Sequence, residues 1–155
     1  MEGIEPGTGT LADKGVWKQV AEAMDATRPG ASKRIAIIED DPLLRTLFSD
    51  TLDCFGDWQL SFFIDGQEAK DRLPELDAHL ILLDVGLPNL DGASLYKILK
   101  GHNKTKDIPI IMITGSHEWE LHRMGLQSGL LLRKPFKIEE LINIITALLP
   151  AEPQS

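Results

Sequence analysis

Short apolar runs alternate along this chain with longer segments in which apolar residues recur at helical spacing. Leu44, Phe48, Leu52 and Phe55 repeat at that spacing between Asp41-Pro42, which is typical of a helix start, and Gly56, which predicts its end. We expect strands at about Arg34–Glu39, Trp58–Phe63, His79–Asp84, Ile108–Thr114 and Leu130–Arg133. We expect the helices at Pro42–Phe55, Gly66–Leu73, Gly92–Lys100, Glu118–Met124 and Lys137–Leu149.

Five repeats of strand and helix predict an α/β fold. The strands are mostly continuous apolar runs, which favours a parallel sheet covered by helices on both faces. Right-handed crossovers limit the topology to a few doubly wound arrangements, of which the flavodoxin-like order 2-1-3-4-5 fits best. In this order the first and third strands are neighbours at the switch point.

Four of the apolar runs end at polar residues of different chemical types. Glu39-Asp40-Asp41 follows the first strand, Asp84 ends the third, Thr114 ends the fourth, and Arg133-Lys134-Pro135 follows the fifth. Parallel strands place their carboxyl ends at one edge of a sheet, so these groups should gather there.

Such a group of side chains suits a cation and a phosphoryl group. Carboxylates from Glu39, Asp40 and Asp84, together with a nearby backbone carbonyl, form an oxygen-only set that favours Mg²⁺. Lys134 would add positive charge and Thr114 a hydroxyl donor for the phosphoryl oxygens. Asp84 is then placed to act as the nucleophile and form an aspartyl-phosphate.

The remaining composition bounds the class of protein. The chain has 155 residues and a net charge of −8, which argues against direct contact with nucleic acid. No apolar stretch approaches the ~18 residues of a membrane span, and the first residues do not resemble a secretory signal, so we expect a cytoplasmic protein. Residues 1–32 look like an extension with a short helix around Trp17, Val20 and Met24, followed by a domain over 33–150 and a tail over 151–155.

The order of these motifs resembles the receiver domain of bacterial response regulators. The resemblance covers about Lys33 to Pro150 and rests on Glu39-Asp40, on Asp84 with Leu87-Pro88-Asn89-Leu90-Asp91-Gly92 behind it, on Thr114, and on Lys134-Pro135-Phe136. It implies that Asp84 is phosphorylated by a histidine kinase or a phosphotransfer protein. It also implies that the Gly86 carbonyl joins Glu39, Asp40 and Asp84 around Mg²⁺, and that the Lys134–Pro135 bond is cis.

On the same resemblance we expect a signalling module with intrinsic phosphotransfer and autodephosphorylation rather than a turnover enzyme. Its state would be read by a downstream protein target, with homodimerisation one form that the output could take. Only a few residues follow the last predicted helix, so we expect either a stand-alone receiver or a piece of a longer protein.

One position departs from the family pattern. Receivers usually carry an aromatic residue three positions before the lysine, and here that position is Leu131. This favours an alternative, a docking domain that works without phosphorylation. A haloacid dehalogenase-type phosphohydrolase would need an acid at Gly86, and a flavin site would need a hydroxyl- and glycine-rich loop in place of Glu39-Asp40-Asp41.

Overall fold

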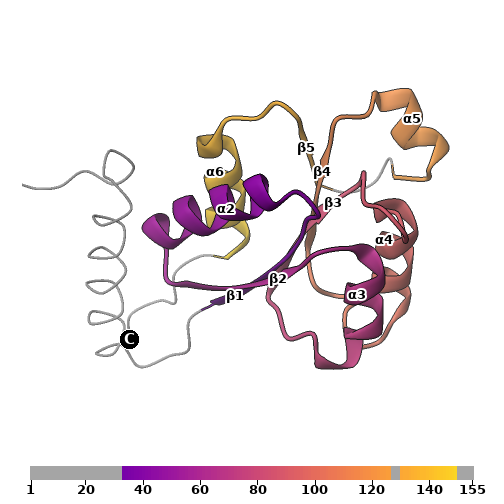
Figure 1. The fold of residues 1–155 in the computed structure, drawn as a ribbon, viewed down its shortest axis with the longest axis horizontal. Coiled ribbons are helices and arrows are strands. Elements are labelled where there is room, and N and C mark those ends of the chain that lie inside the picture. Colours follow the sequence, from indigo (N-terminus) through magenta and orange to yellow (C-terminus); the bar gives the residue numbers. More distant parts are fainter. Residues whose placement is uncertain (1–32, 127–129, 150–155) are drawn as a thin grey trace, which may run out of the picture.

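A computed structural model describes residues 33–126 and 130–149 of the chain (Figure 1). The helix expected within residues 1–32 and the tail expected at 151–155 lie outside the described residues. Within the described part, a central sheet carries helices on both of its faces, as Figure 1 shows.

The sheet has five parallel strands in the order β2-β1-β3-β4-β5, which confirms the predicted flavodoxin-like fold. The strands are β1 (Lys33–Ile38), β2 (Trp58–Phe63), β3 (Leu80–Asp84), β4 (Ile110–Thr114) and β5 (Leu130–Arg133). The central strand β3 is buried along its whole length. This accounts for its continuous apolar sequence, because helices exclude water from both faces of the sheet.

The helices are α2 (Pro42–Phe55), α3 (Gly66–Asp71), α4 (Gly92–Gly101), α5 (Glu118–Arg123) and α6 (Ile138–Leu148), with a short 3₁₀ turn η1 (Leu73–Glu75) after α3. Helices α2 and α6 share one apolar cluster with the residues of one sheet face, which include Ile37, Leu82 and Ile113. The opposite face, with Ile38, Leu83 and Met112, packs with residues of α3, α4 and α5. Two apolar layers therefore hold the sheet between them.

Some predicted boundaries were wrong by one or two residues. The first strand ends at Ile38, so Glu39 lies just beyond the paired register rather than inside it. The fourth strand begins at Ile110 and not at Ile108, and the third begins at Leu80 and not at His79. Helix α3 ends at Asp71 because Pro74, which lacks a backbone N–H, continues the chain only as the 3₁₀ turn.

Across the described ranges 33–126 and 130–149, no helix is both long enough and apolar enough to cross a bilayer.

Candidate functional site

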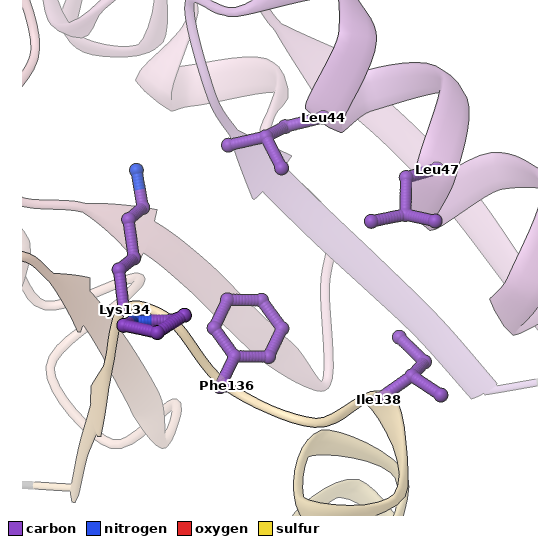
Figure 2. A pocket seen from close by; sticks show the side chains of 6 residues that line it. Leu44, Leu47, Lys134, Phe136 and Ile138 are labelled. Carbon is purple, nitrogen blue, oxygen red and sulfur yellow. The ribbon is translucent and has the colours of Figure 1, made fainter.

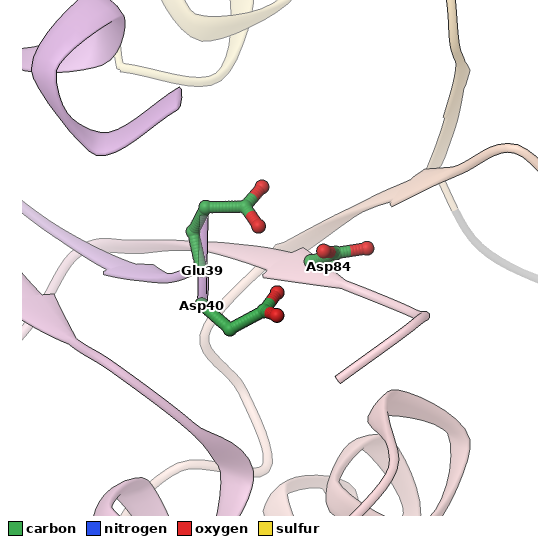
Figure 3. A group of neighbouring side chains, drawn as sticks. All are labelled: Glu39, Asp40 and Asp84. Carbon is green, nitrogen blue, oxygen red and sulfur yellow. The ribbon is translucent and has the colours of Figure 1, made fainter. Parts of the chain in front are cut away.

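Three carboxylates gather where β1 and β3 end. Glu39, Asp40 and Asp84 each place a carboxylate oxygen within 4.8 Å of the others. Figure 3 shows the three side chains gathered at the ends of the two strands. Glu39 and Asp40 follow β1, and Asp84 is the last residue of the adjacent β3. The sheet order thus joins residues separated by more than forty positions, as the sequence predicted.

Asp84 lies at the centre of the group. Its side chain is almost fully buried, and its Oδ1 accepts a hydrogen bond of 3.0 Å from the backbone N–H of Gly86. The Nζ of Lys134 lies 3.6 Å from its other oxygen, Oδ2. One carboxylate oxygen is therefore held by the backbone and the other faces a cation.

Gly86 leaves open space beside this carboxylate. A Cβ added at Gly86 would contact Asp84 Oδ1 at 3.7 Å and nothing else that lies within 4 Å among the described residues. A small ligand can approach the acid from this side without meeting a side chain of residue 86.

The carboxyl group of Glu39, in the same site, has one buried oxygen to which no described residue donates a hydrogen bond. Only 1% of the residue is exposed, and its Oε1 lacks a hydrogen-bond partner among the described residues. The Nζ of Lys134 is 4.0 Å from that oxygen. The other oxygen, Oε2, accepts a hydrogen bond of 3.3 Å from the backbone N–H of Asp41. Burial, and then the neighbouring Asp84, raises the pKa of Glu39 to about 8, although Lys134 acts in the opposite direction.

A divalent cation would offset the repulsion between these acids and the cost of burying Glu39. Buried carboxylates at such short range repel one another unless positive charge lies between them. The donors are all oxygens, and the orphaned Glu39 Oε1 is buried without a hydrogen-bond donor, so the residues fit a hard ion such as Mg²⁺.

Thr114 lies at the end of β4, beside β3, and is buried. Its hydroxyl oxygen accepts a hydrogen bond of 2.9 Å from the backbone N–H of Ser116. Leu131, in β5, pairs with Met112, which lies two residues before Thr114 in β4. Its half-buried side chain packs against the apolar cluster on the face covered by α4. The position expected to carry an aromatic side chain is thus filled by an aliphatic one that belongs to the core.

The loop behind Asp84 is held close to the strand by Gly92. The N–H of Gly92 donates to the carbonyl of Val85 over 3.0 Å, and a Cβ on Gly92 would lie 2.4 Å from the carbonyl oxygen of Asp84. Asp91 caps the same helix, since its side chain accepts from the N–H of Ser94. The glycine therefore permits α4 to start directly against the end of β3.

An apolar groove opens beside the site. It has a volume of about 270 Å³ and is lined by Leu44, Leu47, Lys134, Pro135, Phe136 and Ile138. Figure 2 shows the leucines of α2 across from the segment that leads into α6. Phe136 stacks on Phe48, with ring centroids 6.3 Å apart, and the Lys134–Pro135 peptide bond is cis, as predicted.

Sequence reasoning missed two features. The groove was not predicted, because its leucines show only the ordinary apolar spacing of a helix. Arg45 was also missed, yet its Nη1 donates to the carbonyl oxygens of Glu39, over 2.9 Å, and of Asp40, over 2.8 Å. A basic residue four positions after the helix cap Asp41 was the one available pointer.

Comparison with known proteins agrees with this geometry. Residues 35–146 match the family model of the response regulator receiver domain. The DNA-binding dual master transcriptional regulator RpaA of Synechocystis sp. is 35% identical over 118 residues, covering 75% of this chain and 48% of RpaA. The phosphate regulon regulator PhoB of Escherichia coli K12 is 34% identical over 120 residues, covering 76% and 52%. The chain thus spans about half the length of these relatives.

Solved structures show the same fold. The receiver domain of a sensor histidine kinase from Pseudomonas aeruginosa PAO1, with a magnesium ion coordinated in its active site cleft, is 28% identical and has a TM-score of 0.68. The match covers 76% of this chain and 98% of that one. A signal receiver domain of a histidine kinase from Syntrophus aciditrophicus has a TM-score of 0.70 and is also 28% identical, covering 80% and 98%.

Proposed function

Because the chain belongs to the receiver domains of two-component response regulators, we propose that Asp84 accepts a phosphoryl group from a histidine kinase or a phosphotransfer protein. The observation that carries the proposal is the meeting of a buried acceptor carboxylate, two further acids and a lysine at one sheet edge. Receiver domains are signalling modules, and we infer that this chain likewise uses phosphotransfer to switch state and not to turn over a substrate.

The transfer forms one bond and breaks one. An oxygen of Asp84 attacks phosphorus while the bond from phosphorus to the donor histidine nitrogen breaks, and that nitrogen keeps the electron pair. Lys134 would hold the phosphoryl oxygens, since its ammonium already faces Asp84 across 3.6 Å. The hydroxyl of Thr114, one strand away, would donate to another of these oxygens.

Glu39, Asp40 and Asp84, with the carbonyl of Gly86, would hold Mg²⁺. The ion would supply positive charge that offsets the repulsion between the acids and an incoming phosphoryl group. The orphaned, buried oxygen of Glu39 supports this assignment, because a buried acid without a donor is costly unless a cation meets it.

We further infer where the phosphodonor protein docks. Lys134 lines the apolar groove and also faces Asp84. A protein that transfers a phosphoryl group to Asp84 therefore comes close to the groove. Leu43 is 79% exposed and Leu47 is 43% exposed at the adjacent end of α2. These exposed apolar side chains lie beside the site that the donor protein approaches. They could pack against apolar residues of a helix that carries the donor histidine.

A docking domain that works without phosphorylation remains the competing function. Leu131 favours it, because an aliphatic side chain packed in the core lacks the aromatic ring of the usual readout. The two functions differ in whether the acceptor is used.

Incubation with acetyl phosphate and Mg²⁺, followed by intact-mass measurement, separates them. We expect the wild-type chain to gain one phosphoryl group, and we expect no gain with EDTA or in Asp84→Asn. A wild-type mass that does not change would support the docking function. Phosphorylation of Asp84→Asn would show that the acceptor is another residue.

A further inference from the structure

Arg45 is a basic residue in a place that helix electrostatics disfavours. It lies near the amino-terminal end of α2, where its own N–H makes a helical hydrogen bond to the carbonyl of Asp41, the cap residue. The positive end of the helix dipole repels a cation there. Its position therefore calls for a compensating interaction.

The compensation comes from two backbone carbonyls. Nη1 of Arg45 donates to the carbonyl oxygens of Glu39 and Asp40, over 2.9 and 2.8 Å. The paired registers of β1 end at Ile38, and within the described part of the chain no backbone N–H of a neighbouring strand donates to either carbonyl. Within 33–126 and 130–149 the guanidinium makes no ion pair with an acid of the site, so its contacts there are to the backbone.

These two hydrogen bonds hold both peptide units that flank Asp40. The carbonyl of Glu39 belongs to the peptide before Asp40, and the carbonyl of Asp40 belongs to the peptide after it. Fixing both planes fixes the backbone angles of Asp40 and hence the direction in which its side chain leaves the chain. The side chain is exposed, and the described residues offer it no hydrogen-bond donor of their own that could orient it instead.

The second of these peptides is also held from its other end. Its N–H, which belongs to Asp41, donates to Oε2 of Glu39 over 3.3 Å. Arg45 and Glu39 therefore hydrogen-bond to the same peptide unit, Arg45 through its carbonyl and Glu39 through its N–H. A change at Arg45 is transmitted both to Asp40 and to Glu39.

From this geometry we propose that Arg45 is a positioning residue that aims the acidic pair Glu39-Asp40 at the cation, through their backbone and without touching the ion. The inference rests on the proposed function, since it assumes that these acids bind Mg²⁺. Partners in the outer shell of a metal site typically contribute about 10- to 100-fold to metal affinity.

The test is calorimetric titration of the full chain with Mg²⁺. We expect Arg45→Met, which keeps most of the apolar stem and removes the donors, to bind Mg²⁺ about tenfold more weakly than wild type. Arg45→Lys keeps the charge, but its ammonium is one bond nearer the backbone and lacks the planar fork, so its affinity should fall between the two. Arg34→Met, at the opposite end of β1, removes the same charge and should stay within about twofold of wild type.

A second measurement needs no metal. In EDTA, amide hydrogen exchange at Asp41 should be about tenfold faster in Arg45→Met than in wild type, and unchanged in Arg34→Met, because the clamp on this peptide is lost. Since exchange is followed in the native state, a modest change in global stability does not imitate this local pattern.

The outcomes separate the two proposals. Wild type that does not bind Mg²⁺ contradicts the proposed function itself. Wild-type binding with an equal affinity in Arg45→Met overturns only the role of Arg45. Full affinity in Arg45→Lys combined with loss in Arg45→Met also overturns positioning, because charge alone then explains the effect.

Discussion

The ammonium of Lys134 lies 3.6 Å from Oδ2 of Asp84, although the two residues belong to the ends of strands separated by β4. The same ammonium is 4.0 Å from Oε1 of Glu39. Lys134 thus holds together two acids that repel each other, and it occupies the space where additional negative charge would arrive with a phosphoryl group.

Replacing Lys134 should separate metal binding from phosphotransfer. In Lys134→Met, phosphorylation by acetyl phosphate should slow about 100-fold, because a cation aimed at the transferred group is lost. Mg²⁺ affinity should stay equal or rise, since a competing positive charge has left the acidic cluster. Intact-mass measurements on samples quenched at a series of times give the phosphorylation rate, and calorimetry gives the Mg²⁺ affinity. An equal loss in both would contradict separate roles for the lysine and the ion.

The raised pKa of Glu39 predicts a pH-dependent stability. Its pKa is 4.5 in the unfolded chain and about 8 in the metal-free fold, so between these values the folded state holds a proton that the unfolded state has released. The free energy of unfolding should therefore fall as pH rises through this window, and level off above it.

Urea denaturation in EDTA at a series of pH values measures this effect. Glu39→Gln cannot titrate, so its stability should fall less steeply than that of wild type over the same window. Parallel curves for the two proteins would show that Glu39 is ionised throughout and that its burial is compensated in another way.

Gly92 should tolerate no side chain. A Cβ there would lie 2.4 Å from the Asp84 carbonyl oxygen and 2.5 Å from Val85 Cα, so Gly92→Ala must displace the end of β3 or the helix α4. We expect a loss of about 1–3 kcal/mol in the free energy of unfolding and slower phosphorylation. Gly101→Ala, in the same helix and with open space around the new Cβ, is the matched control and should be neutral or slightly stabilising. Equal stability of the two variants would refute the close approach.

The exposed leucines of α2 should matter for transfer from a protein donor and not from a small one. Leu43→Ser combined with Leu47→Ser should slow phosphotransfer from a purified phosphohistidine protein about tenfold or more, because exposed apolar anchors are removed. The rate with acetyl phosphate should not change. Phe55→Ser, at the other end of α2 and 46% exposed, is the control. A similar slowing with both donors would place the leucines in the chemistry or the fold and not in docking.

The sheet order and most of the site could be predicted from the sequence for a simple reason. Glu39, Asp84, Thr114 and Lys134 each follow an apolar run, and parallel strands bring such ends together at one edge. The gathering of these side chains could be predicted because each stands at the end of a recognisable strand.

The remaining features depend on relations that a sequence does not display. Arg45 acts on backbone carbonyls, which every residue possesses, so no partner residue type marks its role. Leu44 and Leu47 have the spacing of an ordinary buried face. The groove beside them arises only because the fold brings the segment from Lys134 to Ile138 across from α2. Likewise, the end of β1 at Ile38 depends on the register with β3.

The most direct test of the account locates the phosphoryl group itself. After incubation with acetyl phosphate and Mg²⁺, reduction with borohydride converts an aspartyl-phosphate to homoserine, and peptide mass mapping identifies the residue. We predict homoserine at position 84 alone, with none formed in EDTA. Modification at Glu39, Asp40 or elsewhere, or none in a folded protein that binds Mg²⁺, would contradict the claim that this site exists to phosphorylate Asp84.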